Sequence, residues 1–443
     1  MSRPLHRRRA ASHRVAALTV LATAVGVIAC DRGRADSDDT ITISCGAVGD
    51  ELALCREGVA SWAAETGHPV RVVSTPNDAS ERLALYQQIN AAGASDIDVY
   101  QIDTIWPGIL ASHLIDLRSA LGDVAPEHLP AAVVNSTIAG RLVAIPWFVD
   151  IGMLFYRADL LAAYGEAVPE TWAQLTATAH RIQDAERAAG RAKMWGYVWQ
   201  GRAYEGLTCN GLEWLASQGA GTIVSPDGVV TVDNPRAVAA IALAASWIGS
   251  ISPPDVLSGA EEEARAVFQS GHAVFMRNWA YAWSLAQQPD SPIKGRVAVA
   301  RMPRGDDGSH ASTLGGWQLA VSRYSRHPAL AISLVRHLTS RAQQKRRAMV
   351  GSYNPSIMTL YQDPDVLASN PFMGEVVASA LADAELRPSR VSGAHYNQAS
   401  YRFWTAVHDT LSGRSTAAET LERLARQLRR LISQRHAATE VRR

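Results

Sequence analysis

The sequence predicts an α/β protein with two lobes or domains. In its N-terminal part, short β-branched or apolar runs at 40–44, 70–73 and 97–102 alternate with helical patterns at 52–64 and 79–92. Strands that alternate with helices in this way are typical of βαβ units, which build a parallel sheet. The length of 443 residues exceeds what one hydrophobic core commonly supports, and this indicates a second lobe.

The later segments continue to mix both kinds of element, without an internal repeat or a low-complexity tract. Further strands are expected at 142–150, 153–156, 195–199, 273–276, 296–300 and 315–321. Further helices are expected at 170–189, 206–217, 237–248, 264–269, 328–338 and 366–382. The last helix places Leu421, Leu424, Leu428 and Ile432 on one face, so its Arg-rich face is expected in solvent.

Charge and composition narrow the class of protein. There are 43 Lys and Arg residues against 42 Asp and Glu, a net charge of +1, which argues against a nucleic-acid-binding protein. Hydrophobic residues make up 47% and charged residues 19%, as in ordered globular proteins. The 12 Trp outnumber the 6 Phe, an excess that points to aromatic stacking surfaces.

The first 29 residues have the pattern of a secretory signal peptide. Basic side chains cluster between Arg3 and Arg14, an apolar run follows over 15–28, and Ala29 precedes Cys30. This end of the run resembles a bacterial lipobox, so we expect cleavage before Cys30, a lipid on its thiol and a polar tether over 30–39. The alternative, an uncleaved membrane anchor, is disfavoured because the run is shorter than the ~20 residues that a bilayer span needs. We therefore expect an exported protein held at the membrane by its lipid alone.

Three cysteines remain after Cys30. In an oxidising compartment Cys45 and Cys55 have a spacing that permits a disulfide across a strand-to-helix turn. The alternative is that these two residues and Cys209 are small buried hydrophobic side chains. The sequence leaves both alternatives open.

Polar residues follow each of the first three predicted strands. In an open α/β sheet the ligand crevice lies beyond the carboxyl ends of the strands. Glu51 with its neighbour Asp50, the segment 77–82, and Asp103 with Trp106 occupy these positions. Two acids, a basic residue and an indole are therefore expected at one edge. Asp103 has a competing role as a helix N-cap, and Glu51 as a first-turn acid.

Motifs of the common enzyme classes are absent from the sequence. It contains no G-x-S-x-G, no P-loop, no G-x-G-x-x-G after a strand and no H-E-x-x-H. The 13 His are scattered, so we expect neither a metal ion nor a cofactor. Asp103 and Asp150 leave one enzymatic alternative, a secreted glycosidase or transglycosidase with a carboxylate pair. We expect a binding protein rather than an enzyme.

Four motifs follow one another along the chain: W-Q-G-R-A-Y-E-G-L at 199–207, I-S-P-P at 251–254, R-N-W-A-Y-A-W at 277–283 and L-G-G-W at 314–317. In this order they resemble motifs of the extracytoplasmic solute-binding proteins of bacterial sugar ABC importers, in particular the trehalose/maltose-binding branch. The similarity runs from about Thr40 to the C-terminal helix.

The resemblance implies a two-lobed periplasmic-binding-protein clamp of type II, each lobe a mixed β-sheet flanked by helices, with three hinge crossovers. The N-lobe would comprise 40–149 and 298–340, and the C-lobe 150–297 and 341–443. The hinges would lie near 148–151, 297–301 and 339–343.

The resemblance also implies a set of sugar contacts. They are Glu51, Arg82, Asp103, Phe148, Asp150, Trp279, Gly316, Trp317 and Arg387, with Arg390 as a competitor of Arg387. Charged side chains would bond sugar hydroxyls and indoles would cover the ring faces. Phe148 departs from the family, which commonly has Tyr at this position. Among other tryptophans, Trp106, Trp147 and Trp283 suit the core as well as a contact, whereas the core is expected for Trp62, Trp172, Trp214 and Trp247.

The function implied by the resemblance is that of a monomeric, lipid-anchored receptor on the periplasmic or extracytoplasmic face of the membrane. It would capture a disaccharide, trehalose first, with maltose and sucrose as alternatives, and deliver it to two permease subunits that a cytoplasmic ATPase drives. No nucleic acid is implied. A receptor for another solute, such as a peptide or a sugar acid, is the remaining alternative.

Overall fold

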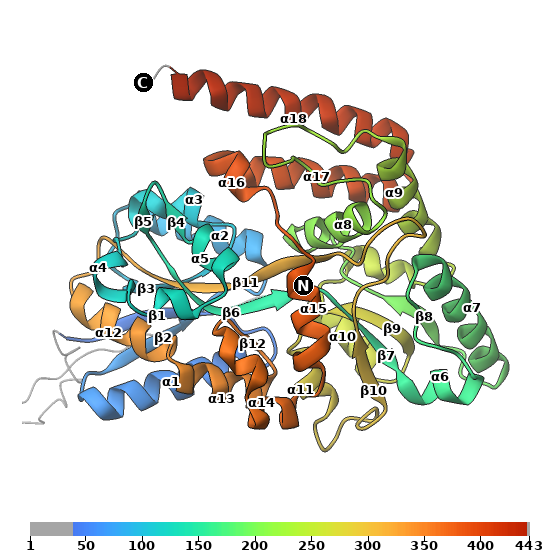
Figure 1. The fold of residues 1–443 in the computed structure, drawn as a ribbon, viewed down its shortest axis with the longest axis horizontal. Helices are drawn as coiled ribbons and strands as arrows, with labels where there is room; N and C mark the ends of the chain where they lie inside the picture. Colours follow the sequence, from blue (N-terminus) through green and yellow to red (C-terminus); the bar gives the residue numbers. More distant parts are fainter. Residues whose placement is uncertain (1–38, 441–443) are drawn as a thin grey trace, which may run out of the picture. The chain divides into compact units, whose positions relative to one another are not determined.

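The computed structural model describes residues 39–440, with side-chain surroundings up to residue 433. The expected signal peptide, the lipidated Cys30 and the tether up to residue 38 lie outside the described residues, which Figure 1 draws as a thin grey trace. Across residues 39–440, no helix combines the length and the apolar character needed to cross a membrane.

The larger sheet belongs to the first lobe. Its order is β12-β6-β11-β3-β1-β2, with β13 paired to β11. β1 is parallel to both β2 and β3, as the βαβ pattern predicts, whereas β11 runs antiparallel to β3 and β6 and makes the sheet mixed. The strands are β1 (Ile41–Cys45), β2 (Val70–Ser74), β3 (Val99–Asp103), β6 (Ile145–Ile151), β11 (Ser312–Val321), β12 (Asn354–Pro355) and β13 (Ala384–Glu385).

The smaller sheet belongs to the second lobe and has the order β10-β7-β9-β8. β8 is parallel to β9, and β7 is antiparallel to β9 and β10. Its strands are β7 (Met153–Arg157), β8 (Trp195–Val198), β9 (Ala273–Asn278) and β10 (Val297–Ala300). A separate hairpin joins β4 (Thr137–Ile138) and β5 (Arg141–Leu142). Two mixed sheets with flanking helices confirm the predicted two-lobed α/β fold (Figure 1).

Helices cover both sheets. Around the first sheet lie α1 (Glu51–Thr66), α2 (Ala79–Ala91), α3 (Pro107–Leu110), α4 (Arg118–Leu121), α5 (Pro130–Asn135), α12 (Pro328–Leu338) and α13 (Arg341–Gly351). The others are α6 (Ala158–Tyr164), α7 (Trp172–Ala188), α8 (Glu205–Ser217), α9 (Pro235–Trp247), α10 (Glu261–Gln269), α11 (Ala282–Ala286), α14 (Pro364–Ser369), α15 (Ala378–Ala382), α16 (Ser389–Ser392), α17 (Tyr396–Leu411) and α18 (Ala417–Glu440). Short 3-10 turns occur at Ala111–His113, Ala125–Glu127, Pro254–Ser258, Met358–Gln362 and Gly393–His395.

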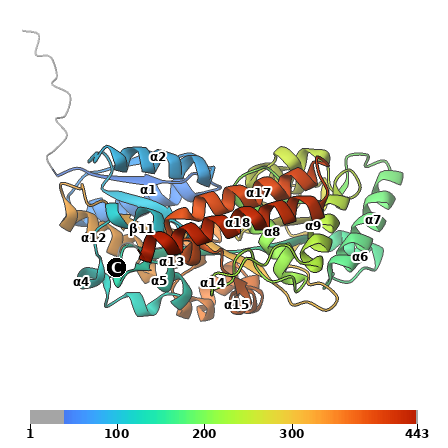
Figure 2. The ribbon, with the colours of Figure 1, turned by 90° about the horizontal axis from the view of Figure 1, so that it is seen from above.

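The last two long helices pack on the second lobe. α17 and α18 lie side by side, and both contact α9, as the two ribbon views show (Figures 1 and 2). Leu421, Leu424, Leu428 and Ile432 of α18 are buried in this contact, which confirms the predicted apolar face.

The helix predicted at 366–382 is interrupted. α14 ends at Ser369, a π-helical turn occupies Met373–Val377, and α15 follows. Pro371 explains the break, because proline lacks the N–H that would continue the helix and its ring clashes with the preceding turn. The amide of Asn370 at the break donates to the Ala348 carbonyl (2.8 Å), which ties the interruption to α13.

A cluster of indoles forms much of the core of the second lobe. Trp172, Trp199, Trp214 and Trp247 are buried, with ring centroids 5.4 Å apart for Trp172–Trp247 and 5.0 Å for Trp199–Trp214. Aromatic pairs at such separations add to the stability that area burial gives. Part of the excess of tryptophan over phenylalanine therefore lies in the core.

The chain passes from the first sheet to the second at Gly152, between β6 and β7. A Cβ atom at Gly152 would lie 2.0 Å from a carboxylate oxygen of Glu213, so only glycine fits beside this buried side chain. The next passage, from β10 to β11, brings the chain back to the larger sheet.

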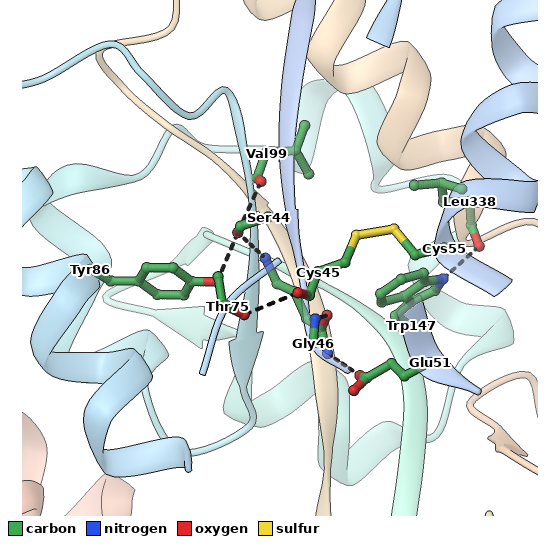
Figure 3. The surroundings of a disulfide bond; sticks show 11 residues. Ser44, Cys45, Gly46, Glu51, Cys55, Thr75, Tyr86, Val99, Trp147 and Leu338 are labelled. Carbon is green, nitrogen blue, oxygen red and sulfur yellow. Dashed lines mark hydrogen bonds between the residues drawn. A yellow bond between two sulfur atoms is a disulfide. The ribbon is translucent and has the colours of Figure 1, made fainter. Parts of the chain in front are cut away.

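A disulfide joins Cys45 at the end of β1 to Cys55 in α1 (Figure 3). This resolves the two alternatives for these cysteines, while Cys209 is a buried free thiol. The bond fixes the short loop that precedes α1, and Glu51 is the first residue of that helix.

We predict that replacing Cys45 and Cys55 by serine lowers the free energy of unfolding by about 2–3 kcal/mol, because the cross-link restricts a short loop of the unfolded chain. Urea unfolding with and without a thiol reductant measures the effect. The reductant should destabilise the wild type and leave the double variant unchanged. An equal response of both proteins contradicts the prediction.

Candidate functional site

A cavity of about 80 Å³ lies between the two lobes. Its lining comes from strands and strand ends of the first lobe, from the segment after β9 and helices of the second lobe, and from the chain after β13. Eight of the nine predicted contacts line it: Glu51, Asp103, Phe148, Asp150, Trp279, Gly316, Trp317 and Arg387. Residues more than 330 positions apart in the sequence therefore meet at one site.

Glu51 is held in the cavity wall by Gln101 of β3. The Gln101 side-chain amide donates to the Glu51 carboxylate, and its oxygen accepts from the backbone N–H of Gly46 (2.7 Å). A Cβ atom at Gly46 would lie 2.3 Å from Glu51 Oε2, so a larger residue would displace the carboxylate. As the first residue of α1, Glu51 also benefits from the positive end of the helix dipole.

Backbone geometry places Trp317. Gly316 has φ +120°, and an added Cβ atom would lie 2.6 Å from the Phe148 carbonyl oxygen of β6. Glycine alone tolerates both the conformation and the close approach. The ring of Trp317 lies against the edge of Trp106, with centroids 5.5 Å apart.

Arg82, the ninth predicted contact, stands behind this indole. It is fully buried on α2, its Cζ atom lies 4.1 Å from the Trp317 ring centroid, and its Nε donates to the Pro76 carbonyl (2.9 Å). Arg82 is not among the residues that line the cavity, so it supports the wall through Trp317.

Arg387 connects the two lobes. Its Nη2 bonds Asp103 at the end of β3 (2.8 Å), and its Nη1 bonds Glu205 at the start of α8 (3.0 Å). Glu205 also accepts from the hydroxyls of Tyr396 and Ser400. Burial raises the pKa of the Glu205 carboxyl above its ordinary value, and the Arg387 charge opposes that rise.

Since Trp106 precedes α3 and no side chain caps that helix, Asp103 is not the helix N-cap that the sequence offered as an alternative role. Its Oδ1 accepts the backbone N–H of Ile105 (3.2 Å) while it pairs with Arg387. The competitor Arg390 does not line the cavity and belongs to a separate groove that Arg387 also borders.

A second buried ion pair supports Trp279. Arg277 of β9 bonds Glu213 of α8 through two contacts of 3.0 and 2.5 Å, and both side chains are fully buried. Arg277 also stacks on Trp279, with its Cζ atom 3.7 Å from the ring centroid. Glu213 in turn accepts the backbone N–H of Thr313 (3.1 Å) at the start of β11. The Glu213 carboxylate thus bonds a strand of each sheet, β9 through Arg277 and β11 through Thr313, next to Trp279.

Asp150 has the most perturbed carboxyl group of the cavity. Burial, together with the negative charges of Glu51 and Asp103, raises its pKa from 3.8 to about 8, and Arg277 opposes this shift. At neutral pH the group therefore keeps its proton, so that it can donate as well as accept a hydrogen bond.

Further lining residues were missed by the sequence analysis. Tyr204 and Glu205 belong to the W-Q-G motif, and Tyr281 belongs to the R-N-W motif. These motifs indicated the family, and the same residues could have been predicted as contacts. Glu261 and Tyr353 lie outside every motif. The Glu261 carboxylate accepts a hydrogen bond from the Trp279 indole (3.4 Å).

The other tryptophans lie outside the cavity lining. Trp106 and Trp147 are buried, and the Trp283 indole donates to the Ser369 carbonyl. Trp62, Trp172, Trp214 and Trp247 occupy the core as predicted.

The arrangement offers hydrogen-bonding acids and ring faces, and no group of His, Cys, Asp or Glu side chains in residues 39–440 is arranged to hold a metal ion. Carboxyl groups accept hydroxyl protons strongly, and indole faces cover C–H surfaces. The cavity is therefore suited to a small polyhydroxylated molecule.

Comparisons with known proteins agree with this description. Residues 52–345 match the family model of bacterial extracellular solute-binding proteins. A "probable ABC transporter-binding protein" of Deinococcus radiodurans is 47% identical over 394 residues, which cover 88% of this chain and 93% of that protein.

Solved structures show the same architecture. The maltose-bound MalE3 of T. maritima matches with a TM-score of 0.84 and 38% identity, over 88% of this chain and 99% of that one. The GacH receptor of Streptomyces glaucescens, solved without ligand and with acarbose, matches with a TM-score of 0.77 over 89% and 98% of the two chains. At 24% sequence identity, this match shows a similar fold and nothing more.

We predict that Asp150→Asn changes how stability depends on pH. The folded protein binds the Asp150 proton more tightly than the unfolded chain, so this group lowers the free energy of unfolding progressively as the pH rises from about 4 to about 8. The variant lacks this loss and should be more stable than the wild type by about 5 kcal/mol at pH 8.5, with the two proteins converging near pH 4.

Urea unfolding at pH 4.5, 7 and 8.5 measures this difference. Asp123→Asn is the control, because the exposed Asp123 pairs with Arg336, which lowers its pKa, and its contribution does not change between pH 5 and 8.5. A gap between wild type and Asp150→Asn that is the same at every pH would show that Asp150 is not protonated in the folded protein.

Proposed function

The chain belongs to the family of bacterial extracellular solute-binding proteins, and from this premise we propose that it captures a neutral disaccharide between its two lobes. Trehalose is the ligand that we place first, with maltose and sucrose as the other members of the class. The protein binds the sugar and releases it unchanged.

The observation that carries the proposal is the meeting of acids and indoles from both lobes around one cavity. Asp103 and Glu51 come from the first lobe, and Trp279 comes from the second. Hydrogen bonds to charged groups contribute roughly 1.5–3 kcal/mol each, which is enough to select a ligand rich in hydroxyls. Trp279 and Trp317 supply ring faces for the apolar sides of two sugar rings.

The size of the cavity bears on how the sugar enters. About 80 Å³ is well below the ~300–1,000 Å³ typical of ligand pockets, so the lobes must separate to admit a disaccharide. We propose that they move about hinges near 148–151, 297–301 and 339–343. The expected division sets 40–149 with 298–340 against 150–297 with 341–443, and we propose that α13 and β12, which pack on or pair within the larger sheet, move with the first part.

Entry of a sugar has a direct consequence for Arg387. Its bonds to Asp103 and Glu205 hold the lobes together, and sugar hydroxyls would replace the bond to Asp103. The ligand shifts the equilibrium toward the closed state by the difference between its binding free energies for the closed and open states.

The relatives support the class of ligand and the type of partner. The T. maritima protein, at 38% identity, was solved with maltose, a glucose disaccharide. The D. radiodurans relative carries the description of an ABC transporter-binding protein. We propose that this chain likewise delivers its ligand to two permease subunits coupled to a cytoplasmic ATPase, and that it acts as a monomer.

We further propose that the protein is exported and tethered by a lipid on Cys30 at the outer face of the cell membrane. The support is the basic and then apolar pattern of the first 29 residues, together with the cysteine that follows it.

We predict micromolar binding, about −8 kcal/mol, of at least one glucose disaccharide. Isothermal titration with trehalose, maltose, sucrose, mannitol and a sugar acid measures the ranking, and overnight incubation followed by glucose assay tests for hydrolysis. Binding with intact sugar is the expected result. Binding of the sugar acid alone contradicts the ligand class, and release of glucose contradicts the binding function.

We also predict that Trp279→Leu weakens disaccharide binding about ten-fold with a stability change similar to that of Trp195→Leu, since the half-buried ring supplies a face to the ligand. Trp195→Leu is a matched control, because Trp195 is also half-buried and stacked by an arginine, Arg187, with its Cζ atom 4.4 Å from the ring centroid. Equal affinity losses in both variants contradict a direct role of Trp279.

A further inference from the structure

Arg347 of α13 lies behind one wall of the cavity. Its side chain is buried, and its Cζ atom lies 4.0 Å from the ring centroid of Trp147, 4.9 Å from Phe148 and 4.8 Å from Tyr353. Phe148 and Tyr353 line the cavity, whereas Arg347 itself does not. A single guanidinium therefore contacts both aromatic side chains of this wall from the rear.

The polar atoms of this guanidinium are unsatisfied. Nε, Nη1 and Nη2 of Arg347 are all buried, and none has a hydrogen-bond partner within residues 39–440. Arg277 and Arg387 differ, since both have carboxylate partners. Arg82 has one bond, from Nε to a carbonyl, and its Nη1 and Nη2 are likewise unsatisfied. Burying a cation without a partner costs free energy, so Arg347 is a poor source of stability.

Two kinds of attraction act on Arg347. Each ring gives a cation–π contact, and these contacts strengthen when water is excluded. Burial lowers the pKa of Arg347, and the negative charge of Glu51, which lines the cavity, opposes that shift at longer range. The positive charge therefore faces the aromatic wall and, beyond it, the acids that meet the ligand.

Besides Arg347, other rings hold this wall. The Phe148 ring centroid lies 5.8 Å from that of Trp147, and Tyr353 stacks on Tyr281 with centroids 6.4 Å apart. Phe148 and Tyr353 contact each other edge to face, with centroids 4.9 Å apart, and the Tyr353 hydroxyl donates to the Val48 carbonyl (2.8 Å). Phe148 has no polar atom that fixes its ring. Its orientation depends on the neighbouring rings and on the cation.

We infer that Arg347 is a positioning residue of the ligand cavity, whose guanidinium holds the rings of Phe148 and Tyr353 in the orientation that a sugar ring contacts. This inference rests on the proposed sugar-binding function. Arg347 acts through the aromatic wall and does not touch the ligand.

The test compares neutral and charged replacements. Arg347→Met and Arg347→Gln both remove the charge, so the result does not depend on one variant folding, and Arg347→Lys keeps it. Both neutral variants should bind the preferred disaccharide about ten-fold more weakly, with unfolding midpoints equal to or above that of the wild type. Arg347→Lys should recover most of the affinity, and Arg187→Met, which removes a remote cation–π contact, should bind as the wild type does.

A second measurement does not need a ligand. Near-ultraviolet circular dichroism reports the packing of aromatic rings, and the neutral variants should change it, whereas Arg347→Lys should not. Wild-type affinity in the neutral variants overturns the inference, as does an affinity loss that merely follows a loss of stability. If the wild type binds no disaccharide, the proposed function fails, and an unchanged dichroism spectrum then overturns the inference independently.

Discussion

The ligand cavity depends on the compensation of buried charge. Carboxyl groups that can bind hydroxyls must sit away from water, and their ionised forms are costly there unless positive groups lie close. Arg387 meets this need for Asp103 and Glu205, and Arg277 meets it for Glu213. Arg387 bonds acids of both lobes, and Glu213 bonds Arg277 of one sheet and the backbone of the other. The same side chains therefore neutralise buried charge and connect the two lobes. Asp150 has no such partner and keeps a raised pKa instead.

The aromatic surfaces follow a related rule. Trp317 is backed by Arg82, Trp279 by Arg277, and the wall of Phe148 and Tyr353 by Arg347. A planar guanidinium packs against the face of the ring that points away from the cavity. It fills the space behind the ring, so the ring cannot rotate into that space. Small residues complete the arrangement, as Gly316 lets β11 approach β6 and Gly46 leaves room for Glu51.

Much of this organisation was predictable from local sequence patterns. β1, β2 and β3 were found from their apolar runs, and the rule that ligands bind beyond strand ends identified Glu51 and Asp103 before any family was considered. Asp150, Trp279, Gly316 and Trp317 required the resemblance. Arg82 stays a predicted contact: it does not line this cavity and lies behind Trp317, and spacing along a helix does not reveal whether an indole lies between an arginine and the cavity. Tyr353 and Arg347 were missed, since their place beside Phe148 is set by the pairing of β12 with β6, some 200 residues earlier in the chain.

The distribution of tryptophan has a consequence for optical work on this protein. Of the 12 tryptophans, Trp279 and Trp317 line the cavity, while the group of Trp172, Trp199, Trp214 and Trp247 lies in the packed interior of one lobe. We expect emission from that interior group to change little when a ligand binds, because none of its four rings lines the cavity. A change of intensity on adding a sugar therefore originates from a small share of the emitters, and single-tryptophan reporters at the cavity would give much larger relative signals than the native chain.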